Sequence, residues 1–391
     1  MNFDEIIDRR GTGSVKWDAM AVANGGPPAP DAIAMWVADM DFRAPDFLQE
    51  SVQALIDKAN YGYFTGESRM KDAVAWWMQQ RHGWSPDPDA MHSTYGLGNG
   101  IALCLQAFTD PGDEVIIFTP VYHEFAAKIR NAGRVVKESP LGIKDGVYHM
   151  DLDALEGALS GRERVVLFCS PHNPAGRVWT PAELQSLAAF CNRHDLILMS
   201  DEIHADLVHP GETHVPMPVA APDCRDRLVM LTSASKTFNV AGARLGCVTV
   251  PDTALRERFA RTLTSLNVSP NLLGVVLTEA AYSPRGAAWV DDLVAYIAEN
   301  SRLFLDGMAA IPGLRAMPMQ STYLAWVDFE NTGMDMAEVQ RRVRQEARLV
   351  PSTGADFGTG GENCLRFNLG MPRARVEEAV NRLQDAFSDL Q

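Results

Sequence analysis

The sequence lacks a long hydrophobic run and is poor in positive charge. No apolar stretch approaches the roughly 20 residues that a membrane span needs. Lysine and arginine total 35 against 50 aspartates and glutamates, a net charge of −15, whereas neutralising nucleic-acid phosphates requires clustered lysines and arginines. The first residues do not show the basic and then apolar pattern of a secretory signal. We therefore expect a cytoplasmic protein that binds neither nucleic acid nor membranes.

Paired cysteines and metal-binding motifs are also missing. The six cysteines form no CxxC pair and most lie in apolar surroundings, which predicts reduced thiols in the core. His204, His209 and His214 recur every five residues, but no HExxH accompanies them and Pro210-Gly211 interrupts any helix between them. The sequence therefore predicts no metal site.

What the sequence does contain is an alternation of short apolar runs with longer helical patterns. That alternation is typical of an α/β fold with a mostly parallel central sheet flanked by helices. In Thr180-Pro-Ala-Glu183 an N-cap hydroxyl, a proline and a glutamate stand in the order of a capping box, which predicts the start of a helix. The apolar runs predict strands at 114–118, 164–169, 196–200, 228–232 and 245–250.

The pattern changes after Pro284. A helical pattern near 287–310, a strand at 322–327, a helix near 336–347, a strand at 364–368 and a last helix from 373 indicate a smaller α+β domain. The length also exceeds what a single core usually holds. We predict an N-terminal arm and small-domain segment at 1–45, a large domain at 46–284 and a C-terminal small domain at 285–391.

One motif gathers hydroxyls, an amine and a guanidinium. It is Ser233-Ala-Ser235-Lys236, followed eight residues later by Arg244. A lysine in a dry pocket forms Schiff bases, and hydroxyls with an arginine can bind a dianionic phosphate. The motif therefore suggests a phosphorylated aldehyde cofactor, although a lone lysine is usually a solvated one. Ser-x-x-Lys also marks serine acyl enzymes of the penicillin-binding kind, but their Ser-Asp-Asn and Lys-Thr-Gly motifs are missing here.

Five other loops hold groups that complement this lysine, and each also has an ordinary structural explanation. Because ligands collect at the carboxyl ends of strands in α/β sheets, polar loops that follow strands are informative. The glycine loop can bind an anion at a helix start, the tyrosine can stack on a ring, and the aspartate can pair with a protonated pyridine. The groups are the loop Tyr95-Gly-Leu-Gly98-Asn99-Gly100, then Tyr122, Asn173, Asp201 with His204, and Arg366.

The order and spacing of these groups resemble the fold type I enzymes that use pyridoxal 5′-phosphate, in the class I/II aminotransferase superfamily. The stretches 8–17 and 35–42, with Tyr61-Gly-Tyr63, are similar to the MalY/PatB group of cystathionine β-lyases. The resemblance implies that Lys236 carries the cofactor as an aldimine, Asp201 pairs with the pyridine nitrogen and Tyr122 stacks on the ring. It also assigns the ring hydroxyl to Asn173 and His204; the phosphate to Gly98, Asn99, Gly100, Ser233, Ser235 and Arg244; and the substrate carboxylate to Arg366 with the backbone near Trp36 and Ala38.

The same resemblance implies a homodimer in which Tyr61 reaches the cofactor of the partner subunit. It implies a carbon–sulfur β-lyase that cleaves cystathionine or related cysteine S-conjugates to pyruvate, ammonia and a thiol. A class I/II aminotransferase shares every residue up to removal of the α-proton, so that alternative remains open. A noncatalytic binding module would have no need of Lys236.

Overall fold

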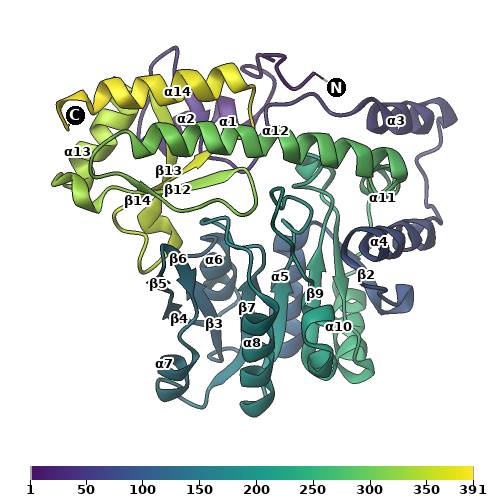
Figure 1. Cartoon of the computed structure of the whole chain (residues 1–391). Helices are drawn as coiled ribbons and strands as arrows, with labels where there is room; N and C mark the ends of the chain where they lie inside the picture. Colours follow the sequence, from purple (N-terminus) through teal and green to yellow (C-terminus); the bar gives the residue numbers. More distant parts are fainter. Residues whose placement is uncertain (1, 391) are drawn as a thin grey trace.

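The computed structural model describes residues 2–390, which contain two large β-sheets, each with its own helices, and a small two-stranded sheet (Figure 1). The larger sheet has seven strands in the order β2-β10-β9-β8-β7-β3-β4. Five of its strands run parallel to their neighbours, whereas β10 pairs antiparallel with both β9 and β2. Its strands are β2 (Met91–Thr94), β3 (Glu114–Thr119), β4 (Val135–Pro140), β7 (Glu163–Cys169), β8 (Ile197–Asp201), β9 (Leu228–Thr232) and β10 (Gly246–Thr249).

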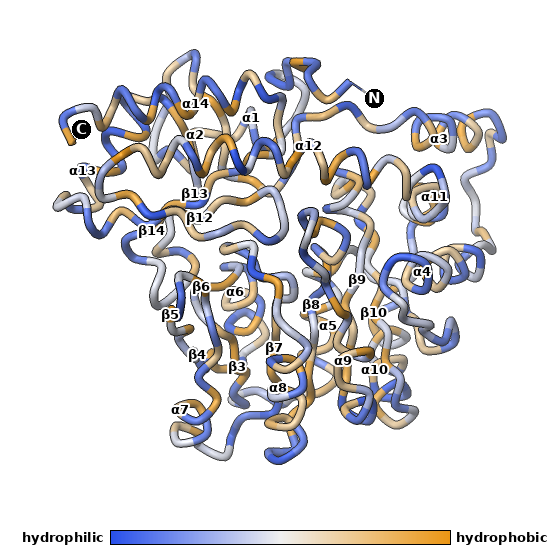
Figure 2. Tube along the Cα trace, in the orientation of Figure 1, coloured by the Kyte–Doolittle hydropathy of each residue, from blue (hydrophilic) through white to orange (hydrophobic). Residues whose placement is uncertain are grey.

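Helices cover both faces of this sheet, which is why its central strands are continuous apolar runs. All residues of β3 and β9 are buried, and Figure 2 shows hydrophobic residues along β7, β8 and the helix α5. The predicted capping box is confirmed, because Thr180 and Glu183 bond reciprocally at the start of α8. The helices of this domain are α5 (Leu97–Phe108), α6 (Glu124–Asn131), α7 (Leu152–Gly157), α8 (Pro181–Arg193), α9 (Met217–Ala220) and α10 (Thr253–Ser265).

The smaller sheet has the order β1-β13-β14-β12-β11. Its first strand comes from the N-terminal arm and pairs parallel with β13, Ile33 opposite Leu349, so the arm completes the small-domain sheet. The long α12 packs beside α14 (Figure 1). The elements are β1 (Ile33–Met35), β11 (Arg315–Ala316), β12 (Leu324–Asp328), β13 (Leu349–Thr353), β14 (Cys364–Asn368), α12 (Pro284–Ala309), α13 (Met336–Arg341) and α14 (Arg373–Ala386).

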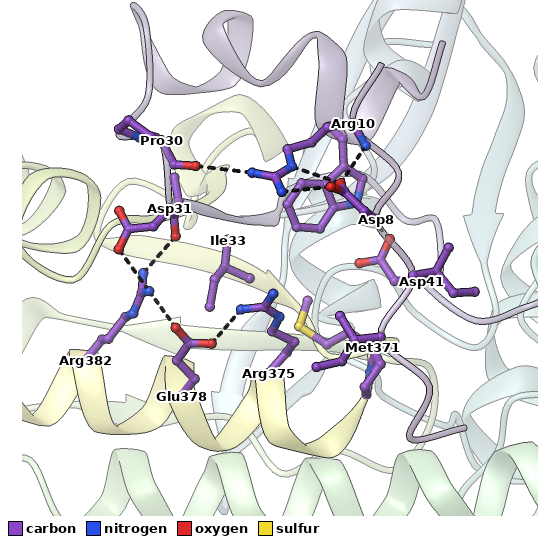
Figure 3. A pocket seen from close by; sticks show the side chains of 15 residues that line it. Asp8, Arg10, Pro30, Asp31, Ile33, Asp41, Met371, Arg375, Glu378 and Arg382 are labelled. Carbon is purple, nitrogen blue, oxygen red and sulfur yellow. Dashed lines mark hydrogen bonds and ion pairs between the residues drawn. The ribbon is translucent and has the colours of Figure 1, made fainter. Parts of the chain in front are cut away.

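Ion pairs fasten the arm to α14. Figure 3 shows Arg382 between Asp31 and Glu378, and Arg375 on the same glutamate, beside a cavity of about 290 Å³. Each such exposed pair contributes little alone, so β1 and the apolar floor at Ile33 supply most of the attachment. The arm also contains α1 (Val15–Asp18) and α2 (Met20–Asn24).

The remaining elements lie at the periphery. The helices α3 (Asp46–Lys58), α4 (Glu67–His82) and α11 (Leu272–Ala281) pack together on one side of the molecule, and β5 (Gly142–Lys144) and β6 (Val147–His149) form a hairpin. Across the described chain, every helix is too short or too polar to cross a membrane. Within residues 2–390, no three or more histidine, cysteine or acidic side chains cluster as metal ligands.

Candidate active site

A cavity of about 500 Å³ opens where the strands of the large sheet end. It lies at the carboxyl ends of β3, β7, β8 and β9, where α/β sheets hold their ligands. Ten of the residues predicted from the sequence line it: Ala38, Gly98, Asn99, Tyr122, Asn173, Asp201, His204, Ser235, Lys236 and Arg244. The structure thus brings together groups that lie up to 206 positions apart in the sequence.

Lys236 extends into this cavity from the turn that follows β9. Its Nζ donates to the carbonyl oxygen of Ala38 over 2.7 Å. Burial and, to a lesser extent, the charge of Arg366 lower the pKa of Lys236 to about 8, against the opposing charges of Asp39 and Asp201. At pH 7 about a tenth of the amine is therefore unprotonated, far more than for a solvated lysine, and the unprotonated form is the one that acts as a nucleophile or a base.

Asp201, at the end of β8, is a buried carboxylate without a cationic partner in contact. Its Oδ1 accepts only the amide of Ile203, over 3.2 Å. Burial raises the pKa of Asp201 to about 7, against the opposing effect of that amide. Since a buried carboxylate is costly unless it is paired, this side chain fits a cation that enters the cavity.

The rings of His204 and Tyr122 both line the cavity. Burial, reinforced by the charges of Lys236 and Arg366, lowers the pKa of His204 to about 3, so its imidazole is neutral. Its Nδ1 is buried and has no hydrogen-bond partner in the described chain. Tyr122 is fixed by its amide, which donates to the Asn173 carbonyl over 3.1 Å, and its ring lines the cavity.

The start of α5 forms the anion-binding end of the cavity. The first amides of a helix have no intrahelical acceptor, and here they belong to Leu97, Gly98 and Asn99. Gly100 departs from the prediction, because its amide already donates to the Gly96 carbonyl over 3.0 Å and it does not line the cavity. The exposed Arg244 lines the same end, and no other residue of the 2–390 range pairs with its guanidinium.

The two predicted serines have different environments. Ser235 lines the cavity, whereas Ser233 donates to the Leu245 carbonyl over 2.7 Å and accepts from the Ser235 amide. Ser233 therefore shapes the turn before Lys236. Of the two serines, only Ser235 lines the cavity and is available to a ligand there.

Arg366 on β14 is buried, does not line the cavity and holds three partners. Its Nη1 donates to Asn173 Oδ1 over 2.9 Å, and its Nη2 donates to the Trp36 carbonyl over 2.7 Å and to Ser352. Its Nε is buried and has no partner in the described chain. Trp36 itself does not line the cavity, so its carbonyl helps to fix the arginine.

Tyr61 does not line this chain's own cavity. It is 64% exposed in the loop between α3 and α4 and makes one long contact, 3.4 Å, with the Ile56 carbonyl. Sequence reasoning also missed lining residues, among them Cys169 and Lys128, which forms an ion pair with Glu124 on α6. The i, i+4 spacing of that pair was the available signal.

These groups fit pyridoxal 5′-phosphate. The unprotonated amine of Lys236 suits its aldehyde, the unpaired Asp201 carboxylate suits its pyridine nitrogen, and the amides at 97–99 with Arg244 suit its phosphate. The fit is chemical: the aldehyde would meet an amine of lowered pKa, the pyridine nitrogen a carboxylate without a charged partner in contact, and the phosphate a helix start whose first amides have no intrahelical acceptor.

Known proteins similar to this chain support the interpretation that the site holds pyridoxal 5′-phosphate. A family model described as aminotransferase class I and II matches residues 37–383. Cystathionine beta-lyase PatB of Bacillus subtilis (strain 168) is 38% identical, over 99% of this chain and 100% of that protein, and Protein MalY of Escherichia coli (strain K12) is 30% identical, over 98% of each. The crystal structure of cystalysin from Treponema denticola, which contains a pyridoxal 5′-phosphate cofactor, has a TM-score of 0.94 and 34% identity, over 100% of this chain and 99% of that chain. The predicted fold class and family resemblance are confirmed.

Proposed function

This chain belongs to the class I and II aminotransferase family, and we propose that it is a pyridoxal-phosphate-dependent carbon–sulfur β-lyase. The proposed substrates are L-cystathionine or related cysteine S-conjugates, and the products are pyruvate, ammonia and a thiol. The observation that carries the proposal is the position of Lys236, whose amine of lowered pKa lies in one cavity with the unpaired Asp201 carboxylate. The full-length similarity to PatB, a protein named cystathionine beta-lyase, supports the reaction type.

The bound cofactor supplies an electron sink for the pair released when the substrate's α-hydrogen leaves as a proton. The chain's own residues do the rest. Lys236 Nζ would hold the cofactor, and as a free amine it would take that proton; its lowered pKa makes the unprotonated form more available near neutral pH. Asp201 would hold the ring nitrogen in its protonated form, and Tyr122 would supply an aromatic wall beside the ring.

Arg366 orients the substrate. Its planar guanidinium suits a carboxylate, and Asn173 and the Trp36 carbonyl hold it in place. A fixed carboxylate and a fixed amino group together set the direction of the bond from the α-carbon to hydrogen, so that Lys236 is the group that meets it.

We also propose a homodimer with shared active sites. Tyr61 is exposed and does not line its own chain's cavity, as expected of a side chain that completes the partner's site. Six free and buried cysteines support our expectation of a cytoplasmic location.

The test is a spectrum and an assay. The purified protein with pyridoxal phosphate should show a visible absorbance band that Lys236→Ala removes. Incubation with cystathionine should release pyruvate without any added keto acid. A band with turnover only when a keto acid is present would instead identify an aminotransferase, and a colourless protein that cannot be reconstituted would contradict both.

A further inference from the structure

The loop after β8 buries two carboxylates that the proposed reaction does not use. These are Glu202 and Asp206, in the same six residues as Asp201. Asp206 is 8% exposed, and its oxygens accept three side-chain hydrogen bonds from two other parts of the chain. The donors are Trp77 Nε1 at 2.8 Å and His82 Nε2 at 2.7 Å, both on α4, and Thr237 Oγ1 at 3.0 Å.

Thr237 is the residue directly after Lys236. Its side chain is fully buried, and the hydrogen bond to Asp206 Oδ2 ties its hydroxyl to the rigid part of the domain. The turn that holds both residues lies outside any strand or α-helix. Because adjacent Cα atoms are only about 3.8 Å apart, fixing Thr237 also fixes the point from which the Lys236 side chain starts.

The environment of Asp206 keeps it charged. Burial alone would raise its pKa, but the hydrogen bond and charge of His82, with the bonds from Trp77 and Thr237, hold the pKa of Asp206 below its usual value. An ionised acceptor makes stronger hydrogen bonds than a neutral one. On the α4 side, Trp77 stacks on Tyr282 with ring centroids 4.9 Å apart, so the anchor is itself packed in the core.

The second carboxylate of this loop is tied differently. Glu202 accepts from Ser200, the Met217 amide and His214, and none of these donors adjoins Lys236. Of these two carboxylates, only Asp206 therefore contacts the turn that holds Lys236 and Thr237.

We propose that Asp206 is a positioning residue, which through Thr237 sets where the Lys236 amine lies in the cavity. This inference rests on the proposed function, because it concerns the lysine that would hold the cofactor. A misplacement of about 1 Å can lower the rate of a reaction about 100-fold, so one hydrogen bond that fixes the residue next to Lys236 can have a large effect on the rate.

The experiment uses the reconstituted protein and three variants of one hydrogen bond. Thr237→Val removes the hydroxyl at nearly constant volume, and Thr237→Ser retains the hydroxyl. Asp206→Asn removes the negative charge that accepts the hydrogen bond from this hydroxyl. Thr109→Val is the matched control, since it deletes a buried hydroxyl that accepts from Arg134 at the far end of α5. The readouts are the pH midpoint of the visible band, the melting temperature, and kcat and KM.

We expect Thr237→Val and Asp206→Asn to shift the midpoint by about 0.5 pH unit or more and to lower kcat by about tenfold, with KM little changed. Thr237→Ser should match the wild type. Thr109→Val should lower the melting temperature and leave the pH midpoint of the visible band unchanged.

A Thr237→Val protein that melts earlier but keeps the wild-type midpoint and kcat would overturn the positioning role. If Thr237→Val does not fold, the pH midpoint of the visible band in Asp206→Asn provides the same test. A wild-type protein without a band contradicts the proposed function, whereas a normal wild-type band that no variant shifts contradicts only this inference.

Discussion

Three carboxylates in one short loop differ in what surrounds them, and that difference decides what each can do. Glu202 and Asp206 each have an imidazole within hydrogen-bond distance, His214 and His82 respectively. Asp201 has only one backbone amide. The residue that is left without a partner is the one placed to bind a cation from outside the chain.

Removing the Asp201 charge should stabilise the protein without cofactor and abolish its activity. The folded-state pKa of about 7 lies above the usual 3.8, so between these pH values the folded chain binds more protons than the unfolded one. Stability therefore falls as pH rises through that window. In Asp201→Asn this loss should vanish, raising the unfolding free energy at pH 8 by about 1–3 kcal/mol, while kcat falls by about 100-fold or more.

Urea unfolding of the protein without cofactor at pH 5 and pH 8 measures the effect. The exposed Asp195→Asn, whose side chain is 99% accessible, is the control and should leave the pH dependence unchanged. An Asp201→Asn protein with the wild-type pH dependence would show that this carboxylate is not the source.

At the scale of elements, the site depends on how closely β10 approaches the start of α5. A Cβ built on Gly246 would lie 2.9 Å from the Leu97 amide nitrogen and 2.9 Å from the Gly96 carbonyl carbon, both backbone atoms. Glycine is required there because the helix start cannot move away without displacing the amides that face the cavity. In the sheet β10 lies between β2 and β9, and β2 directly precedes this helix in the chain.

Gly246→Ala should therefore weaken cofactor binding more than it weakens the fold. We expect the dissociation constant for pyridoxal phosphate to rise about tenfold, roughly the loss of one good hydrogen bond to the phosphate. Equilibrium titration of the visible band measures it. Gly157→Ala, at the end of α7 with no atom within 4 Å of the added Cβ, should bind the cofactor normally. Equal affinities in the two variants would refute the role of this close approach.

At the scale of the molecule, the segment 36–40 joins the two sheets at the cavity. Each of its five consecutive carbonyl oxygens accepts at least one side-chain hydrogen bond. The arm, the large domain and the small domain are therefore all hydrogen-bonded to this one segment. The donors are Arg366 and Ser352 to residue 36, Asn368 to residue 37, Lys236 and Tyr323 to residue 38, Lys16 and Asn368 to residue 39, and Arg9 and Asn239 to residue 40.

Mixing two inactive variants tests whether the site also needs a second chain. A Lys236→Ala chain and a Tyr61→Ala chain are each expected to be inactive or nearly so as homodimers. In a hybrid dimer, the intact Lys236 of one chain meets the intact Tyr61 of the other. After unfolding and refolding together, the mixture should recover about a quarter of wild-type activity, since half of the dimers are hybrids with one of two sites intact. No recovery, with hybrids confirmed by differently tagged chains, would place Tyr61 outside the partner's site.

Local signals predicted five of the seven strands of the large sheet and the start of α8, but fewer than half of the elements that the structure describes. The capping box at Thr180 marks a helix start because its hydrogen bonds close within four residues, and the strand at 228–232 is a fully buried apolar run. The sequence did not reveal β1, which has only three residues and needs β13, more than 300 positions away, to be a strand. Nor did it reveal that β10 runs antiparallel, since direction is decided by the neighbouring strands.

The sequence by itself determined which chemical groups this protein brings to its site: the lysine, the aspartate, the glycine-rich helix start and the arginine, in an order that points to one cofactor. The tertiary structure alone decided which of those groups remain free. Gly100 and Ser233 proved to have their hydrogen bonds already made, whereas Asp201 lacks a charged partner and Asp206 has three donors. The reason is physical: the residue type fixes what a group can bind, but burial and the nearest partners, contributed by distant parts of the chain, fix whether it is still available to do so.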